Sequence, residues 1–222
     1  MKLFKNFIKI NGSNNQIVSA KIKGNHFYDR SPVKIKGNNN RIEINPHNQF
    51  YKLELIINGS NNLICIDEGC WGSLKIIIDT DNTTVRIGKK CAFRGLECGL
   101  WEKGSSLIIG DEVMAAKDSR MYVSDFHAIV DIDSMEAVNQ GRNITIGNHV
   151  WLGERAMVLK NNRIADDVIV AAGSIVTKDL DESHAIYAGN PAKPVKRGMT
   201  WFEDKYDIYQ AKRSLQSGSN GD

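Results

Sequence analysis

The sequence has no long hydrophobic run. No apolar stretch among its 222 residues approaches the roughly 20 residues that cross a bilayer, which predicts that the chain has no membrane span. The first ten residues, MKLFKNFIKI, are too short and too often interrupted by lysine for a signal peptide. We therefore expect a soluble, cytoplasmic protein that is long enough to bury a core of its own.

Cysteine is also scarce, and the four cysteines form no Cys-x-x-Cys pair: Cys65, Cys70, Cys91 and Cys98. Closely spaced cysteines are the usual sign of a metal or redox centre. Scattered ones are typical of small, buried apolar residues in a reducing compartment. We therefore expect neither disulfides nor a bound metal.

Charge is nearly balanced over the whole chain but not along it. The net charge is +3, whereas residues 1–60 contain ten Lys or Arg against three Asp or Glu. A basic surface of this kind either keeps sheet edges soluble or attracts a polyanion such as an acidic glycan, a membrane surface or nucleic acid. Composition leaves these alternatives open.

What the chain has in abundance is repetition. The string INGSNN occurs twice, at residues 10–15 and 57–62, and related copies are VKIKGNNNRI from Val33 and, more degraded, IIIDTDNTTV from Ile76. Each copy reads as a β run, a polar Gly/Asn turn and a second β run, because Gly and Asn tolerate the left-handed backbone that such turns need. Counted with their first β run, the copies start at Ile8, Val33, Leu55 and Ile76, which are 21 to 25 residues apart, and this predicts one repeated structural unit.

The second half has a tighter period of six. Six apolar residues follow one another at this spacing: Ile146, Leu152, Val158, Ile164, Val170 and Val176. The residues two positions before them are mostly small or apolar, and residues two apart on a strand share a face. Each hexad therefore turns two side chains inward, and the uninterrupted short period predicts a parallel β-helix.

One histidine, His127, lies where this pattern breaks. After Val123–Ser124 the apolar spacing is lost until Ile144, which predicts an extruded loop. Long loops on a regular scaffold are typically functional, so a histidine at the root of this loop is a candidate catalytic residue. The other four histidines lie beside no such break and are expected to be structural: His26, His47, His149 and His184.

Two further features accompany His127. Trp151 follows it by 24 residues, one coil plus one hexad, so the two residues could meet across neighbouring coils or neighbouring subunits. Trp151 also lies between inward-facing neighbours, so its indole should point outward and make a contact. Farther on, small residues around Ala172 would leave a groove on the coil surface. A cationic cluster suited to phosphate groups comes next: Lys178, Lys193, Lys196 and Arg197.

Together these residues strongly resemble the hexapeptide-repeat acetyltransferases. The segments GNHVWLG, AGNPAKPVK and TWFEDKYD are most similar to the capsule-modifying polysialic acid O-acetyltransferases of that family. The resemblance is specific from Ser124 to Tyr206 and only architectural upstream. It implies an all-β fold, a left-handed parallel β-helix over residues 1–190 with irregular coils to about residue 100, and a short helical C-terminal segment over residues 191–222.

The resemblance also implies a reaction. Acetyl-coenzyme A would donate its acetyl group directly to a sugar hydroxyl, in an acidic polysaccharide for preference, with His127 as general base. A hydroxyl is nearly un-ionised at neutral pH, and a base that titrates near pH 7 accelerates such a step by roughly 10²–10⁴-fold. Trp151 would position the coenzyme or the acceptor, and Asp125 is the nearest candidate in sequence to orient His127. The site would lie between subunits of a homotrimer.

The coenzyme residues implied by the resemblance are Gly153, Ala172, Thr177 and Lys178 along the pantetheine, and Lys193 and Lys196 near the phosphates. The chain departs from the family pattern at two places. Glu154 stands where a small or neutral residue is common and could shift the coenzyme or form a salt bridge. The run KNNRIADD lacks the usual turn but keeps Ile164, which predicts an intact coil with an altered turn.

Three other functions are possible on such a fold. N-acetylation of a nucleotide-linked amino sugar often goes with an N-terminal Gly-rich nucleotide-binding loop, and none precedes the repeats. A zinc carbonic anhydrase needs three histidines at coil spacing, and the hexads contain no His-x₄-His pair. A non-catalytic glycan-binding solenoid remains an alternative; it predicts that the loop after His127 and the lysine cluster are incidental.

Overall fold

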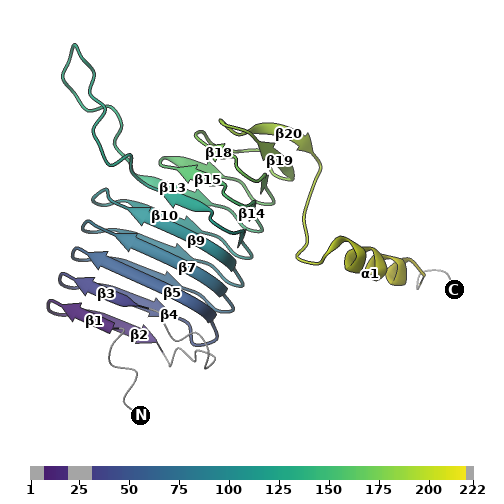
Figure 1. The fold of residues 1–222 in the computed structure, drawn as a ribbon, viewed down its shortest axis with the longest axis horizontal. Coiled ribbons are helices and arrows are strands. Elements are labelled where there is room, and N and C mark those ends of the chain that lie inside the picture. Colours follow the sequence, from purple (N-terminus) through teal and green to yellow (C-terminus); the bar gives the residue numbers. More distant parts are fainter. Residues whose placement is uncertain (1–7, 20–31, 219–222) are drawn as a thin grey trace.

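The computed structural model describes residues 8–19 and 32–218, so His26 and five of the ten basic residues of the first sixty lie outside it. Within these residues the chain winds into a parallel β-helix with three faces, followed by one helix (Figure 1). The predicted parallel β-helix, the extruded loop and the short helical segment are all confirmed.

The strands form three columns, which we name faces A, B and C; each complete coil runs from face A to face B to face C. Strands β5 (Gln49–Asn58), β7 (Trp71–Ile78) and β9 (Ala92–Leu100) are long enough to start on face A and end on face B. Face A continues with β11 (Met114–Ala115), β14 (Trp151–Leu152), β17 (Ile169–Val170) and β19 (Ala185–Ala188), and ends with the antiparallel β20 (Lys193–Arg197).

The other two columns are parallel throughout. Face B comprises β1 (Ile8–Asn11), β3 (Val33–Lys36), the ends of β5, β7 and β9, then β12 (Arg120–Tyr122), β15 (Met157–Leu159) and β18 (Ile175–Val176). Face C is a seven-stranded sheet of β2 (Gln16–Ser19), β4 (Arg41–Ile44), β6 (Leu63–Ile66), β8 (Thr84–Ile87), β10 (Ser106–Ile109), β13 (Asn143–Ile146) and β16 (Asn162–Ile164).

The repeated INGSNN motif forms the corner between faces B and C. The fifth residue of the motif is an asparagine with a left-handed backbone in each early coil. Its φ is 55° to 58° at Asn14, Asn39, Asn61 and Asn82. A Cβ on Gly37 would lie 2.0 Å from the carbonyl oxygen of Gly59 in the next coil, so only glycine fits there. The motif recurs because every coil must turn the same corner.

Side chains at this corner are hydrogen-bonded from coil to coil. In the buried ladder, Asn40 donates to Asn15 at 2.9 Å, Asn62 donates its backbone N–H to Asn40 at 3.1 Å, and Thr83 donates its hydroxyl to Asn62 at 2.8 Å. Stacked polar side chains thus satisfy the backbone groups that the turn removes from the sheets.

The core is a column of apolar side chains inside the prism. All six residues of the predicted hexad series are at most 1% exposed, so the six-residue spacing identified the inward positions correctly. Ile164 is among them, and the coil with the altered turn is intact, because the Asn162 amide donates to the carbonyls of Leu159 and Lys160. Cys70, Cys91 and Cys98 are buried and free, whereas Cys65 is half-buried and points outward.

Coil length changes along the axis. Ladder contacts join residues 22 apart between early coils and 18 apart between the last ones. One interval of 37 residues contains the loop between β12 and β13. Figure 1 shows this loop standing out from one end of the strands, whereas α1 (Tyr206–Gly218) projects from the other side of the solenoid and does not lie along it.

Candidate active site

His127 lies at the B–C corner, at the root of the loop that spans residues 123–142. Its side chain is exposed, and its backbone is held on both sides: its N–H donates to the Asp125 carbonyl at 2.8 Å, and its own carbonyl accepts from the Asn139 amide at 2.9 Å. A Cβ on Gly141 would lie 1.9 Å from the Val123 carbonyl oxygen, so glycine is needed where the two ends of the loop meet. The scaffold thus presents an imidazole to solvent on a fixed backbone.

Asp125, the residue expected to orient His127, makes other contacts. Its carboxylate accepts from the Lys160 ammonium and, at 2.8 Å, from the Asn139 amide. These donors, with Lys160 first, hold the pKa of Asp125 below its ordinary value. Asp125 therefore anchors the loop root to the next coil and, through Asn139, fixes the His127 backbone.

Three aromatic side chains surround the loop root, and the hexad pattern gave no sign of them. Phe126 packs on Trp101 with ring centroids 4.0 Å apart, and Trp101 meets Tyr122 edge-on at 5.3 Å. The Trp101 indole lies over Gly99, where a Cβ would come 1.8 Å from the ring. Because Gly99 has no side chain, it leaves space on face B for the Trp101 indole.

The rest of the loop is apolar as well as exposed. Five aliphatic side chains on it are 44% to 86% exposed: Ile129, Val130, Ile132, Met135 and Val138. The loop is nevertheless ordered by internal bonds, including a Val130–Ala137 bridge and a turn in which Asp131 accepts from Ser134. A protruding, ordered and apolar loop is typical of a contact surface.

Trp151 lies on face A, away from the loop. As expected, its indole points outward while Leu152 points inward, and it has a contact: Trp201, from the segment after β20, lies 6.1 Å away between ring centroids. Trp201 also stacks on His149 at 4.5 Å and donates its indole N–H to the His149 carbonyl at 2.8 Å. The Trp151 Nε1 is buried and has no hydrogen-bond partner among the described residues.

His149 is held as a structural residue would be. Its Nδ1 lies 2.8 Å from an Asp167 carboxylate oxygen, and its ring is covered by Trp201. Sequence reasoning missed Trp201 because the contact joins residues 52 apart along the chain. The segment TWFEDKYD was the only available sign.

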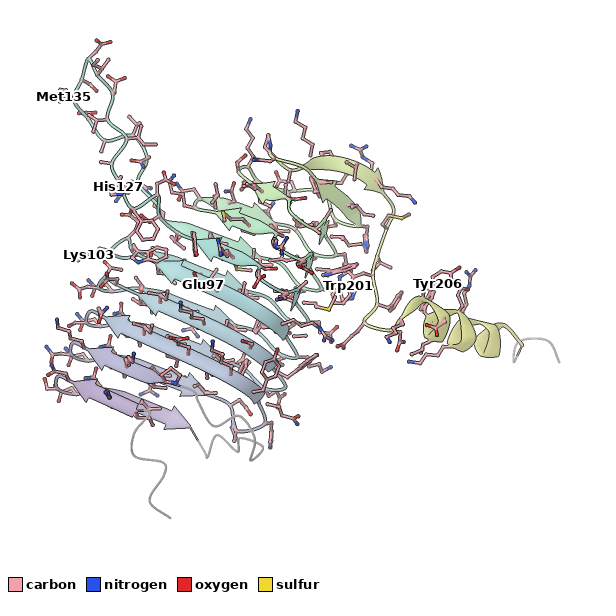
Figure 2. All side chains as sticks on the ribbon, viewed as in Figure 1. Glu97, Lys103, His127, Met135, Trp201 and Tyr206 are labelled. Atoms are coloured by element: carbon pink, nitrogen blue, oxygen red, sulfur yellow. The ribbon has the colours of Figure 1, made fainter. Side chains whose placement is uncertain are left out.

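Within one chain, His127 and Trp151 do not meet. Figure 2 shows His127 at the loop root on one side of the solenoid and Trp201, which covers Trp151, on the other. The 24-residue spacing therefore does not bring the two side chains together in a single subunit.

The six predicted coenzyme residues fall into three places. Gly153 and Ala172 touch at the A–B corner, where a Cβ on Gly153 would lie 2.5 Å from the Ala172 nitrogen. Thr177 and Lys178 lie at the B–C corner after β18, and both are exposed. Lys193 and Lys196 are exposed on β20, against β19.

Other sequence features have plainer outcomes. Glu154 forms a long ion pair with Arg155 at 3.9 Å, on the surface. In residues 8–19 and 32–218 no cluster of three or more His, Cys, Asp or Glu has metal-binding geometry. In the same residues no helix combines the length and the hydrophobicity that crossing a membrane requires.

Comparison with known proteins gives the following relatives. No family model matches the chain. A polysialic acid O-acetyltransferase of Escherichia coli O1:K1 is 32% identical over 125 residues, which are 56% of this chain but only 40% of that protein. A polysialic acid O-acetyltransferase of Neisseria meningitidis is 29% identical over 205 residues, 82% of this chain and 93% of that protein. A chloramphenicol acetyltransferase of Klebsiella aerogenes is 40% identical over 67 residues, 30% of this chain and 31% of that protein.

Solved structures agree with these relatives. The polySia-specific acetyltransferase NeuO superposes with a TM-score of 0.80 and 29% identity, over 96% of this chain and 97% of that one. The polysialic acid O-acetyltransferase OatWY matches with a TM-score of 0.50 and 20% identity, over 94% of each chain, which is a likeness of fold. The handedness expected from the family resemblance, a left-handed β-helix, is confirmed.

Proposed function

We propose that this chain is an acetyltransferase of the hexapeptide-repeat, left-handed β-helix class, and that it O-acetylates a sugar hydroxyl in an acidic polysaccharide, with acetyl-coenzyme A as donor. The names of two relatives support the acceptor class, since both are polysialic acid O-acetyltransferases. Support for polysialic acid as the acceptor also comes from the solved structure that superposes over nearly the whole chain, a polySia-specific acetyltransferase.

The observation that carries the mechanism is the exposed His127 ring on a backbone fixed at both ends. In the proposed step, the imidazole takes the proton of the acceptor hydroxyl as the oxygen attacks the thioester carbonyl carbon. The new C–O bond forms, the C–S bond breaks, and the departing thiolate takes the proton back from the imidazolium. No acyl-enzyme is needed, and the histidine ends the cycle neutral.

The coenzyme would lie along the surface that joins the predicted donor residues. Gly153 and Ala172 place small residues against each other at the A–B corner, which suits a narrow pantetheine arm. Thr177 and Lys178 would border it at the next corner. Lys193 and Lys196 carry exposed ammonium groups on β20 that suit the nucleotide phosphates.

We propose further that the active unit is a homotrimer. His127 and Trp151 lie on different sides of one chain, so a site that uses both needs two chains. The exposed apolar side chains of the loop supply a surface for such a contact.

The test is thiol release from acetyl-coenzyme A with polysialic acid as acceptor, for the wild type and for His127→Ala. We expect acceptor-dependent release that falls by at least 10²-fold in the variant. His149→Ala is the matched control, since His149 has a carboxylate partner at 2.8 Å and is the rival base by geometry. Full activity in His127→Ala, or an equal loss in His149→Ala, would reject His127 as the base.

A further inference from the structure

Phe126 is an unusual residue for its position. It lies directly before His127, its ring is 58% exposed, and its backbone has a left-handed φ of 64°. Bulky residues such as Lys90 and Arg155 adopt this conformation at other corners of the solenoid, but at the corner between faces B and C the other coils use asparagine or glycine. A solvent-exposed phenylalanine on a strained backbone calls for a functional explanation.

The ring is supported from below. Trp101 packs against it at 4.0 Å and is itself seated over Gly99 and beside Tyr122. The Tyr122 hydroxyl donates to Glu97 at 2.5 Å, and Lys75 donates to the same carboxylate at 2.9 Å. Trp101 and Tyr122, which lie beneath Phe126, are thus fixed to face B, and the outer face of the Phe126 ring stays uncovered.

The backbone at Phe126 is supported too. Its N–H donates to the Ser124 hydroxyl at 3.0 Å, and Ser124 donates to the Glu102 carboxylate at 2.7 Å. The turn that carries Trp101 and the loop root that carries Phe126 are therefore joined by hydrogen bonds as well as by ring packing.

We propose that Phe126, backed by Trp101, is the acceptor-binding platform: the apolar C–H face of the sugar ring stacks on it while a hydroxyl of the same ring reaches His127. This rests on the proposed function, because the location of the acceptor follows from the role of His127. The reacting oxygen must lie within hydrogen-bond distance of the imidazole, so the rest of its ring falls beside the neighbouring residue. A pyranose presents C–H groups on one face, which suit an aromatic surface, and hydroxyls around its rim.

The platform explains the cost of the left-handed backbone. Asparagine or glycine at position 126 would close the corner with less strain, as in the early coils, but would offer no apolar surface beside the base. The chain therefore has a strained phenylalanine at position 126 because its ring orients the acceptor. A transfer without a covalent intermediate requires that orientation.

The experiment measures acceptor binding separately from turnover. Sialic acid oligomers are titrated calorimetrically into His127→Ala protein and into the same protein with Phe126→Ala added. We expect the dissociation constant to rise about 5- to 10-fold, the range of an aromatic stacking contact, and Phe126→Tyr to restore it. In the His127-containing enzyme, Phe126→Ala should raise KM for the acceptor and leave KM for acetyl-coenzyme A unchanged.

Phe202→Ala is the matched control. Phe202 is also an exposed aromatic residue, at 55%, but it directly follows Trp201, which lies on the other side of the solenoid from His127 (Figure 2). Equal binding with and without the Phe126 ring, an equal effect of Phe202→Ala, or a change of molecular mass in solution on Phe126→Ala would overturn the platform; the last would make the ring a subunit contact. Absence of acceptor-dependent turnover in the wild type would instead reject the proposed function, which the calorimetric result does not depend on.

Discussion

At the scale of single residues, Trp201 makes a contact that joins residues 52 positions apart in the chain. Its ring is 9% exposed although it lies outside the prism, because it covers His149 and approaches Trp151. Its indole N–H bonds the His149 carbonyl, so one residue closes face A beside the proposed coenzyme surface and starts the C-terminal segment. Trp201 is therefore as buried as a core residue, although it lies on the outside of face A and fastens the C-terminal segment there.

We expect Trp201→Ala to lower the free energy of unfolding by about 3 kcal/mol, the cost of removing a buried aromatic side chain. Trp201→Phe keeps the ring and loses the hydrogen bond, so its cost should be about 1 kcal/mol. Denaturant unfolding measures both. The control is Phe202→Ala, since Phe202 is 55% exposed and should cost less than about 0.5 kcal/mol. Similar values for Trp201→Ala and Phe202→Ala would contradict the assigned role.

At the scale of elements, the corner between faces B and C depends on its inner ladder. Asn62 is 2% exposed; it accepts from the backbone N–H and the hydroxyl of Thr83 and donates to the Thr80 carbonyl. Asn62→Ala leaves these buried groups unpaired, and we expect a loss of about 2–3 kcal/mol in denaturant unfolding. Asn61→Gly removes the neighbouring exposed amide while keeping a residue that accepts the left-handed φ of 58°, and should cost far less. Equal losses would mean that burial of the ladder is irrelevant.

The loop root is the second element with a measurable stability. The pKa of Asp125 is held below its ordinary value by its bond from Lys160, then by Asn139. A carboxyl with a depressed pKa contributes stability that is complete above its ordinary pKa, and loses it as the pH falls through the lower folded value. Amides of residues 125–142 should therefore keep their protection from hydrogen exchange above the ordinary aspartate pKa of about 3.9 and lose it progressively as the pH falls below that value.

Two variants make this a test of the root rather than of the whole loop. Asp125→Asn should lose loop protection already at pH 6, because the neutral amide no longer attracts the Lys160 ammonium. Asp131→Asn disturbs only the turn near the tip, where Asp131 accepts from Ser134, and should leave the root protected. Unchanged protection in Asp125→Asn would show that the ion pair does not hold the loop.

The elements also show how far sequence reasoning reaches. Corners and inward positions were predictable because each coil repeats the same local demands: two inward side chains, then a turn residue with a left-handed backbone. The position of the loop followed from the break in the period at His127. The packing of Phe126 on Trp101 and of Trp201 on His149 was not predictable, because rings that meet across coils leave no periodic trace in one sequence.

At the scale of the whole molecule, the charge is divided along the axis. On face B, Lys34 of β3 is paired with Lys9 of β1, and Lys36 lies two residues farther along β3. These three lysines border an open groove of about 530 Å³ at the N-terminal end of the solenoid. If this surface attracts an anionic polymer, KM for polysialic acid should rise more steeply with salt than KM for a short neutral galactoside. Lys34→Glu should raise KM for the polymer alone. Lys205→Glu, an equal change of charge beside α1, should not, and equal effects would reduce the result to net charge.

The separation of His127 and Trp151 gives the last prediction. Alone, His127→Ala and Trp151→Ala are both expected to be nearly inactive. In randomly mixed trimers, a site built from two chains is intact when one chain supplies His127 and its neighbour supplies Trp151. Each condition holds half the time in an equal mixture, so about a quarter of the sites should be restored.

Unfolding and refolding the two proteins together, then assaying thiol release with polysialic acid, measures this fraction. Co-refolded wild type sets the yield, and each variant refolded alone sets the background. A site within one chain would give no recovery, because no single chain in the mixture contains both residues. Recovery near a quarter would therefore establish that the loop root of one subunit works against face A of another.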